Sequence, residues 1–452
     1  MRAEPLQKFI QLCVIRGFCV NLHTILQFKK MKVYKFGGAS VKNADGVRNL
    51  ESILRKHTAN EQLVVVISAI GKTTNLLEQI LDAYYYDKKK LAALTATLRE
   101  NHYTIVRELT LGDDSVIMKK LNDIFEELDE VLAGPHTGNF DYDYDRIVSF
   151  GEILSTTLIS NYLNHKGIAN EWVDARMLIR TDHNYREGKV NWDESARLIQ
   201  GKVGGIFSEG KANIVVSQGF IGGTEEMLPT TLGREGSDYS AAIFAYVLKA
   251  ESVTIWKDVP GLLNADPKFF PEAVKLEQIS YEEAIELAYY GASVIHPKTL
   301  KPLQNKQIPL FVKPFLHPEE NGSRIDGGRM KKHIPCYIFK TNQVLISIYP
   351  KDFSFIAVEN LDEIFAIISK NKIKINLMQN SALSFSICCD NKIHKIEKLI
   401  EDLSGKYKVK YNLNIELITI RHYTDSIVAQ MIKDKEVLVE QRSRATVQLV
   451  TM

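Results

Sequence analysis

The chain has 452 residues, of which 45% are hydrophobic and 25% are charged, and its formal net charge is +2. At roughly 150 residues per domain, this length predicts two to four domains of ordinary globular composition. The balanced charge argues against a partner such as nucleic acid or a membrane surface, so we expect any anion to be bound at a local site.

The cysteines and the first thirty residues indicate the cellular compartment in which the protein resides. The five cysteines show no regular spacing, which favours a reducing cytoplasm over a disulfide framework or a zinc site. Residues 9–28 are fairly apolar, but polar residues interrupt them, so they match neither a membrane helix nor a secretory signal. We therefore interpret residues 1–30 as an N-terminal extension, and Met31 as a candidate natural start.

From residue 31 onward, short apolar runs alternate with segments of helical periodicity. This alternation predicts an α/β fold with a mainly parallel sheet covered by helices. Between residues 76 and 147 the pattern is mainly helical, which indicates a helical insertion in the sheet domain. We expect strands at 33–36, 63–67, 214–217, 253–256 and 308–312, and helices at 46–57, 238–248 and 281–290.

Glycine and polar residues at 319–332 break the pattern and predict a domain boundary. Beyond it, the predicted order is β (344–348), α (361–369), β (374–378), β (383–388), α (392–403) and β (415–420). This βαββαβ order is typical of a ferredoxin-like module. Residues 426–450 are too few for a full second unit. We thus expect a sheet domain at 31–325 and a second region at 326–452.

The first predicted strand ends in Lys35, and Gly37 and Gly38 follow. Backbone amides of glycines can approach phosphate oxygens closely, and a lysine supplies a balancing charge. Alone, this pattern is about as typical of a tight turn as of a phosphate-binding loop.

A second polar segment, residues 230–240, combines glycines, hydroxyl groups, Arg234 and Asp238. The planar guanidinium of Arg234 suits a carboxylate ligand, although a surface ion pair is the alternative. Asp238 could organise a phosphoryl-transfer centre with Lys35 or simply cap a helix. Ser237 would add a hydroxyl donor.

Two common nucleotide motifs are absent from the sequence. Residues 71–73 read Gly-Lys-Thr, but Val66 occupies the position where a P-loop requires glycine. No Gly-x-Gly-x-x-Gly pattern follows a predicted strand, which excludes a Rossmann dinucleotide half.

Taken together, five ordered segments resemble the aspartate kinase family, within the amino acid kinase fold. They are residues 35–41, 68–75, 150–155, 230–240 and 256–261. The resemblance covers residues 31–325, and the second region resembles the ACT regulatory domains of that family. It is closest to a monofunctional kinase, without the fused homoserine dehydrogenase of some relatives.

This resemblance implies ATP-dependent phosphorylation of L-aspartate to 4-phospho-L-aspartate, the first step towards lysine, threonine and methionine. It implies catalytic roles for Lys35 and Asp238. The substrate-binding residues that it implies are Thr74, Glu152, Arg234, Glu235, Gly236 and Ser237. Glu152 would bind the substrate ammonium group, but near a predicted helix start it could instead complement the helix dipole.

The implied cofactors are ATP and Mg²⁺, with the magnesium held mainly by phosphate and substrate oxygens, so no protein metal ligand is expected. Many relatives have lysine at the position of Ser293. His296 precedes a proline and is interpreted as a structural turn residue. The implied nucleotide-binding residues are Lys35, Phe36, Gly37, Gly38, Ser40, Lys257, Asp258, Leu263, Lys268, Ser293 and Val294.

The ACT resemblance implies a homodimer formed through this region and leaves feedback by lysine or threonine open. No glycine occurs at 350–357, and Asn376 stands where relatives often have aspartate, although Ser381 occupies a plausible effector position. Two other functions stay open: a glutamate or acetylglutamate type of amino acid kinase, and a catalytically silent amino acid sensor.

Overall fold

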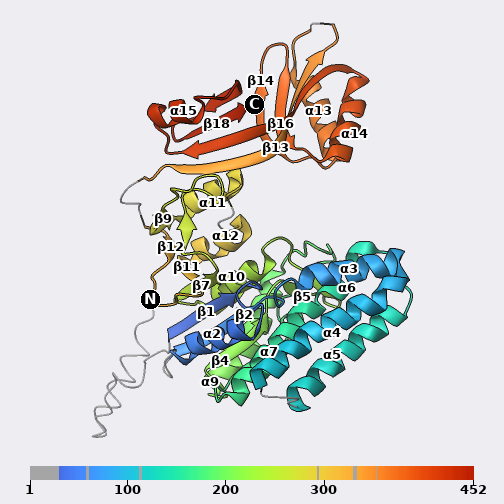
Figure 1. Ribbon diagram of the computed structural model, residues 1–452, viewed down its shortest axis with the longest axis vertical. Helices are drawn as coiled ribbons and strands as arrows, with labels where there is room; N and C mark the ends of the chain where they lie inside the picture. Colours follow the sequence, from blue (N-terminus) through green and yellow to red (C-terminus); the bar gives the residue numbers. More distant parts are fainter. Residues whose placement is uncertain (1–29, 57–60, 111–114, 293–294, 329–332, 353) are drawn as a thin grey trace, which may run out of the picture.

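The computed structural model describes residues 30–56, 61–110, 115–292, 295–328, 333–352 and 354–452 (Figure 1). The predicted extension at 1–30 therefore lies outside the described residues, except for Lys30. Two sheets dominate the structure, one built from residues 30–326 and the other from residues 336–451.

The first sheet has eight strands in the order β10-β12-β11-β7-β1-β2-β4-β3, and all its neighbours are parallel except β11 and β12. Its central strands are rich in valine and isoleucine and almost fully buried, as parallel strands covered on both faces require. The bounds are β1 Lys30–Phe36, β2 Glu61–Ile67, β3 Glu171–Val173, β4 Ile214–Gln218, β7 Ser252–Lys257, β10 Gln278–Ser280, β11 Leu310–Pro314 and β12 Ser323–Asp326.

Helices pack on this sheet, and two short ribbons extend it. The helix α10 (Gly236–Leu248) contacts β1, β2 and β7. The remaining helices of this part are α2 Ala44–Arg55, α8 Trp192–Ile199, α9 Gly205–Ser208, α11 Tyr281–Tyr290 and α12 Pro297–Lys306. The ribbons pair β5 Ile221–Gly223 with β6 Pro229–Thr231, and β8 Leu262–Leu263 with β9 Lys275–Leu276. Short helical turns lie at Ala175–Met177 and Gln200–Gly204.

Five helices lie between β2 and β3 in the chain and form a bundle beside the sheet (Figure 1). The last of them, α7, contacts β2, β3 and β4, so the bundle is anchored to the sheet. The helices are α3 Thr73–Tyr86, α4 Lys88–Thr110, α5 Ser115–Ala133, α6 Phe140–Val148 and α7 Phe150–His165.

The second sheet is antiparallel, with six strands in the order β14-β15-β13-β16-β18-β17. We call residues 336–452, which carry it, the C-terminal module. Its elements are β13 Cys336–Pro350, α13 Val358–Lys370, β14 Ile375–Asn380, β15 Phe385–Asp390, α14 Ile393–Ser404, β16 Tyr407–Arg421, α15 Asp425–Met431, β17 Val437–Arg442 and β18 Thr446–Thr451.

The strands β13 and β16 are far longer than the sequence pattern predicts. Each runs through a bulge where Asn342 and Asn414 have positive φ angles, of 51° and 56°. On one side of the bulge the two strands complete the βαββαβ unit. On the other side they pair with each other, and β16 also pairs with residues 446–451. The predicted fold class, a mainly parallel α/β sheet followed by a ferredoxin-like module, is confirmed.

Hydrophobic side chains form one large cluster around the eight-stranded sheet and three smaller clusters in the C-terminal module. Cys388 and Cys389 are fully buried in β15. Among the described helices, none combines the length and the apolar character that a membrane span needs.

Candidate active site

The ammonium group of Lys35 lies 2.7 Å from the Oδ1 atom of Asp238, and that of Lys257 lies 3.8 Å from the Oδ2 atom. Lys35 and Lys257 come from the ends of the adjacent strands β1 and β7, and Asp238 from the first turn of α10. Burial alone would raise the pKa of Asp238, but the two ammonium groups lower it below its ordinary value. The centre therefore holds an ionised carboxylate between two cations.

Asp238 is not the cap of its helix. The N-cap of α10 is Glu235, whose side chain makes no capping hydrogen bond, and Asp238 is only 2% exposed beneath that end. Asp238 is instead a buried carboxylate with two lysine neighbours, so the simple capping alternative is excluded.

A cavity of about 930 Å³ opens over this centre and is lined by residues from several parts of the chain. The end of β1, the start of α3, the start of α7 and the segment 231–238 all contribute to its wall. All eight predicted catalytic or substrate residues line it, together with Lys257. They are Lys35, Thr74, Glu152, Arg234, Glu235, Gly236, Ser237 and Asp238.

Arg234 lies exposed in this wall. Among the described residues, no carboxylate forms an ion pair with its guanidinium, so the surface salt bridge considered from the sequence is not found. An unpaired guanidinium facing a cavity is available for a carboxylate of a ligand.

Glu152 lies in the first turn of α7 and is 2% exposed. Its Oε1 atom accepts a hydrogen bond from the Ala69 N–H at 3.1 Å, whereas its Oε2 atom is buried without a hydrogen-bond partner among the described residues. Burial raises the pKa of Glu152 to about 8, although the Ala69 N–H and the charge of Lys35 act in the opposite direction. The unsatisfied oxygen beside the cavity suits a ligand that donates a hydrogen bond, such as an ammonium group.

The glycine loop after β1 packs tightly against the loop after β2. A Cβ atom on Gly38 would lie 2.6 Å from the Ala69 carbonyl oxygen and 3.0 Å from that of Gly71, and the Gly71 N–H donates to the Gly38 carbonyl at 3.0 Å. Ser40 donates from its hydroxyl to the Trp256 carbonyl at 3.3 Å. Glycine at position 38 is thus required by backbone packing.

The predicted nucleotide segment follows β7 and includes three exposed or half-buried residues outside the cavity wall, Asp258, Leu263 and Lys268. The backbone N–H of Lys268 donates to Asp266 at 2.9 Å. Trp256 is a buried core residue, and Phe36 stacks on it. Ser293 and Val294 lie outside the described residues.

The backbone around Glu235 is shaped by its neighbours. Glu235 has a φ of 53°, and its Oε2 atom accepts the His296 N–H at 2.7 Å. The ring of His296 accepts the Lys298 N–H at the start of α12, which confirms its structural role. A Cβ on Gly236 would lie 2.7 Å from the Phe220 ring, so glycine lets α10 begin against that side chain.

The sequence analysis missed one wall of the cavity, formed by α6 and the loop at 184–187. Asp145 accepts three hydrogen bonds, from the Thr231 N–H at 2.9 Å, the Thr231 hydroxyl at 2.7 Å and the Arg186 N–H at 2.9 Å. Burial raises the pKa of Asp145 to about 6. The Arg186 guanidinium lies over the Tyr144 ring at 4.2 Å. An aspartate in a helical run gave no local signal of these contacts.

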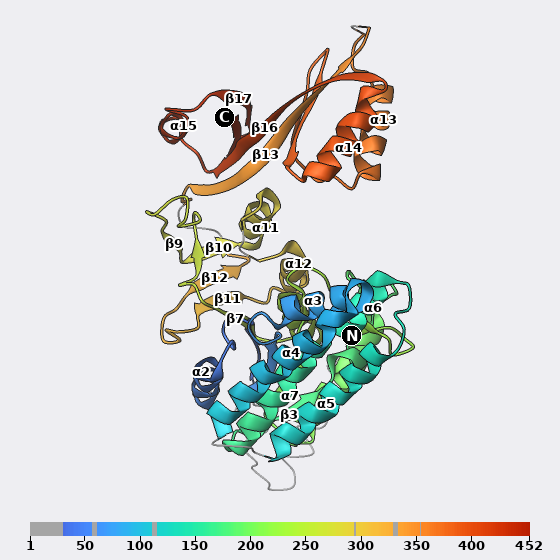
Figure 2. The ribbon, with the colours of Figure 1, turned by 45° about the vertical axis from the view of Figure 1, so that its right-hand side comes forward.

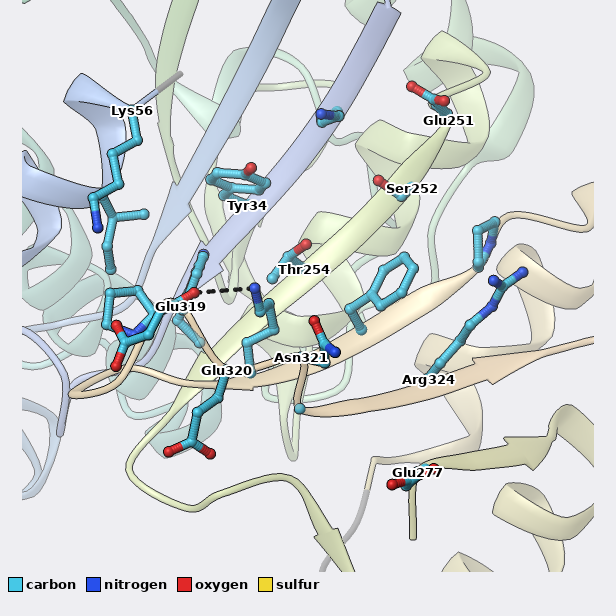
Figure 3. Close-up of a pocket in the computed structure, with 18 of the residues that line it drawn as sticks. Tyr34, Lys56, Glu251, Ser252, Thr254, Glu277, Glu319, Glu320, Asn321 and Arg324 are labelled. Atoms are coloured by element: carbon cyan, nitrogen blue, oxygen red, sulfur yellow. Dashed lines mark hydrogen bonds between the residues drawn. The ribbon is translucent and has the colours of Figure 1, made fainter. Parts of the chain in front are cut away.

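A larger cavity of about 1210 Å³ lies on the opposite face of the same sheet (Figure 3). Tyr34 and Thr254 face it, and because side chains alternate along a strand, Lys35 and Lys257 face the other way. It contains none of the predicted catalytic or substrate residues.

The positions considered for an effector are already engaged within the C-terminal module. The Nδ2 atom of Asn376 donates to Gln343 at 2.8 Å and to Asp390 at 2.9 Å, and its Oδ1 atom accepts from Lys340 at 2.8 Å. The Ser381 hydroxyl bonds that of Ser384 at 2.7 Å.

The sequence and the structure were compared with those of known proteins. The model of the amino acid kinase family matches residues 30–314, which include every element of the cavity wall described so far. The chain belongs to the amino acid kinase family. Two relatives and a solved structure match beyond this range.

Among these relatives is lysine-sensitive aspartokinase 3 of Escherichia coli, 30% identical over 79% of this chain and 78% of that protein. A solved structure of E. coli aspartokinase III in complex with aspartate and ADP superposes with a TM-score of 0.79, at 25% identity, over 93% of this chain and 96% of that one. The Arabidopsis thaliana chloroplastic bifunctional aspartokinase/homoserine dehydrogenase 1 is 28% identical over 83% of this chain, which spans 42% of that protein's length. The resemblance to aspartate kinases is thereby confirmed.

Proposed function

We propose that the protein is an ATP-dependent kinase that phosphorylates the side-chain carboxylate of L-aspartate. The observation that carries this proposal is the convergence of Lys35, Asp238 and Lys257 in a cavity whose wall also holds Arg234 and Glu152. The ammonium groups of Lys35 and Lys257 could offset the negative charge of a transferring phosphoryl group. Arg234 matches the α-carboxylate of an amino acid, and Glu152 matches its ammonium group. The name of the E. coli relative solved with aspartate and ADP supports the same substrate pair.

In the proposed reaction, one oxygen of the substrate β-carboxylate attacks the γ-phosphorus of ATP, and the bond to the bridging oxygen breaks to release ADP. The attacking oxygen is already ionised, so no general base is needed. Lys35 and Lys257 offset charge on the phosphoryl oxygens, and Asp238 holds their ammonium groups in place. The glycine amides at 37 and 38 lie beside Lys35 and would bind phosphate oxygens.

The binding sites of the nucleotide and the metal are also part of this proposal. We assign ATP to the loop at 35–40 together with Lys257, Asp258, Leu263 and Lys268, and to Ser293 and Val294 from the family resemblance. We propose that Mg²⁺ would be held mainly by phosphate and substrate oxygens, since it usually keeps several non-protein ligands at kinase sites.

A hydroxylamine assay tests the reaction. Purified protein is incubated with MgATP, hydroxylamine and either aspartate or glutamate, and hydroxamate is measured. Product from aspartate alone supports the proposal, whereas product from glutamate identifies the other kinase type. Binding of aspartate without product identifies an amino acid sensor. Lys35→Ala should abolish turnover in protein that circular dichroism shows to be folded, and near-wild-type activity would refute the role of Lys35.

Regulation and assembly can be measured with the same preparation. We propose that the C-terminal module binds an allosteric amino acid, lysine or threonine, and forms a homodimer; the name of the lysine-sensitive relative supports the effector. Adding each amino acid to the assay tests the first point. Light scattering of the eluted protein tests the second, and a monomer mass at assay concentration would reject it.

A further inference from the structure

The C-terminal module contributes one residue to the wall of the active cavity, and that residue is Lys372. Every other residue of this wall lies between positions 35 and 257. Lys372 belongs to the turn between α13 and β14, so it comes from a part of the chain that the family match at 30–314 does not include.

The turn that carries Lys372 is fixed by hydrogen bonds. Lys372 has a φ of 50°, and its N–H donates to the Ser369 carbonyl at 2.9 Å. The side-chain amide of Asn371 donates to the Ile367 carbonyl at 3.0 Å and to Asp402 at 2.9 Å. A backbone held in this way presents the exposed side chain of Lys372 at a defined place.

The module as a whole is also fixed to the sheet domain. Arg421 bonds Glu283 of α11 at 2.6 and 3.0 Å and Glu286 at 2.9 Å. The rings of Phe270 and Tyr337 stack at 4.7 Å. Both ribbon views show α11 lying between the two sheets (Figures 1 and 2). The approach of Lys372 to the cavity therefore rests on a specific interface.

Positive charge is in excess at this end of the cavity. Among the described residues, neither Lys372 nor Arg234 has a carboxylate within ion-pair distance. Lys340 and Lys374 lie close to Arg234. Burial and the charges of Lys374 and Arg234 lower the pKa of Lys340, and the carboxylate of Asp390 acts in the opposite direction. Two exposed cations at one cavity, Lys372 and Arg234, are an arrangement that an anionic ligand would complete.

We propose that Lys372 is a substrate-binding residue supplied by the C-terminal module, which together with Arg234 forms the cationic end of the cavity and binds a dicarboxylate amino acid. This inference rests on the proposed function and extends it, because it makes the affinity of the kinase for its acceptor depend on the docked module. It assigns Lys372 no part in the phosphoryl transfer itself.

Steady-state kinetics of the full-length protein test the proposal. Lys372→Ala should raise the KM for aspartate roughly threefold and Lys372→Glu roughly tenfold, with kcat nearly unchanged, as expected for one charge near a partly solvated anion. Lys372→Arg keeps the charge and should stay within about twofold of wild type. The matched control is Lys395→Glu, an equal charge reversal on an exposed residue of α14 in the same module.

Calorimetric titration of aspartate without ATP gives a second readout, which does not depend on turnover. Weaker binding by Lys372→Glu but not by Lys395→Glu supports the proposal. An unchanged KM in Lys372→Glu, an equal shift in Lys395→Glu, or an effect confined to the KM for ATP would overturn it. A wild-type protein that binds aspartate without phosphorylating it would instead reject the proposed reaction. Melting temperatures of all variants exclude misfolding as the cause.

Discussion

Lys35 and Asp238 form an ion pair of 2.7 Å in which both side chains are almost inaccessible to water, at 8% and 2% exposure. Strand β1 supplies the cation and α10 the anion, although more than 200 residues separate them in the chain. This pair makes the site sensitive to the loss of either partner.

Asp238→Asn should lower kcat at least about 100-fold and destabilise the fold by about 3 kcal/mol, because two ammonium groups lose a buried counter-charge. Steady-state rates and urea denaturation measure the two effects. The control is Lys32→Ala. Lys32 lies in β1 like Lys35, and its ion pair with Glu61 of β2 is more exposed, so its loss should lower the free energy of unfolding by about 1 kcal/mol or less. Equal losses in the two variants would contradict the assigned role of Asp238.

The raised pKa of Glu152, about 8, predicts how substrate affinity depends on pH. Below pH 8 the free protein holds this side chain mainly as the neutral acid, which binds an ammonium group poorly. The KM for aspartate should therefore fall as the pH rises from 6.5 to 8.5. Glu152→Gln should raise the KM and remove this pH dependence, and a Gln variant with the wild-type profile would assign the dependence to another group.

Glu152 should also affect stability in the opposite sense to an ordinary ion-paired carboxylate. Its folded-state pKa exceeds the unfolded value, so between about pH 4.5 and 8 the folded protein binds more protons. The contribution of Glu152 to the free energy of unfolding then decreases by about 1.4 kcal/mol per pH unit as the pH rises through this window. Denaturation of the wild type and of Glu152→Gln at pH 5 and pH 7.5 measures the difference in slope.

Gly38→Ala should reduce stability by about 1–3 kcal/mol and impair ATP binding, since the new methyl group would meet two backbone oxygens that cannot move independently. Gly201→Ala is the matched control because a Cβ at that position would contact nothing within 4 Å. Thermal denaturation and nucleotide titration measure both variants. A tolerated alanine at position 38 would show that the two loops do not need their close approach.

Arg421→Met should uncouple the two parts of the chain, because it leaves the buried Glu283 without its bidentate partner at a cost of about 3 kcal/mol. We expect the single melting transition to broaden or split in scanning calorimetry, and the KM for aspartate to rise as Lys372 loses its place. Lys406→Ala, which removes an exposed ion pair with Glu363, serves as the control. A single unshifted transition in Arg421→Met would contradict the role of this contact.

Local patterns were sufficient for the alternating elements and for the residues at strand ends. Lys35, Glu152 and Asp238 each follow a recognisable strand or begin a helix, and the structure brings them to one cavity. Asp145, Arg186 and Lys372 could not be found in this way. Their positions depend on packing between α6, a loop and a distant turn, and no periodicity or spacing encodes that packing.

The same distinction explains the lengths of β13 and β16. Their central residues alternate as ordinary strands, but their extensions are defined by distant partners. Residues 336–340 of β13 pair with residues 417–421 of β16, and this part of β16 also pairs with β18. A short stretch of sequence shows the alternation of side chains but not the pairing with distant strands. For this reason residues 426–450 looked too short to complete a unit.

The parallel stacking of Phe36 on Trp256 and the hydrogen bond from the Ser40 hydroxyl to the Trp256 carbonyl join the glycine loop to the end of β7 from behind. These two segments must consequently shift together, and separating them would expose two aromatic rings to solvent.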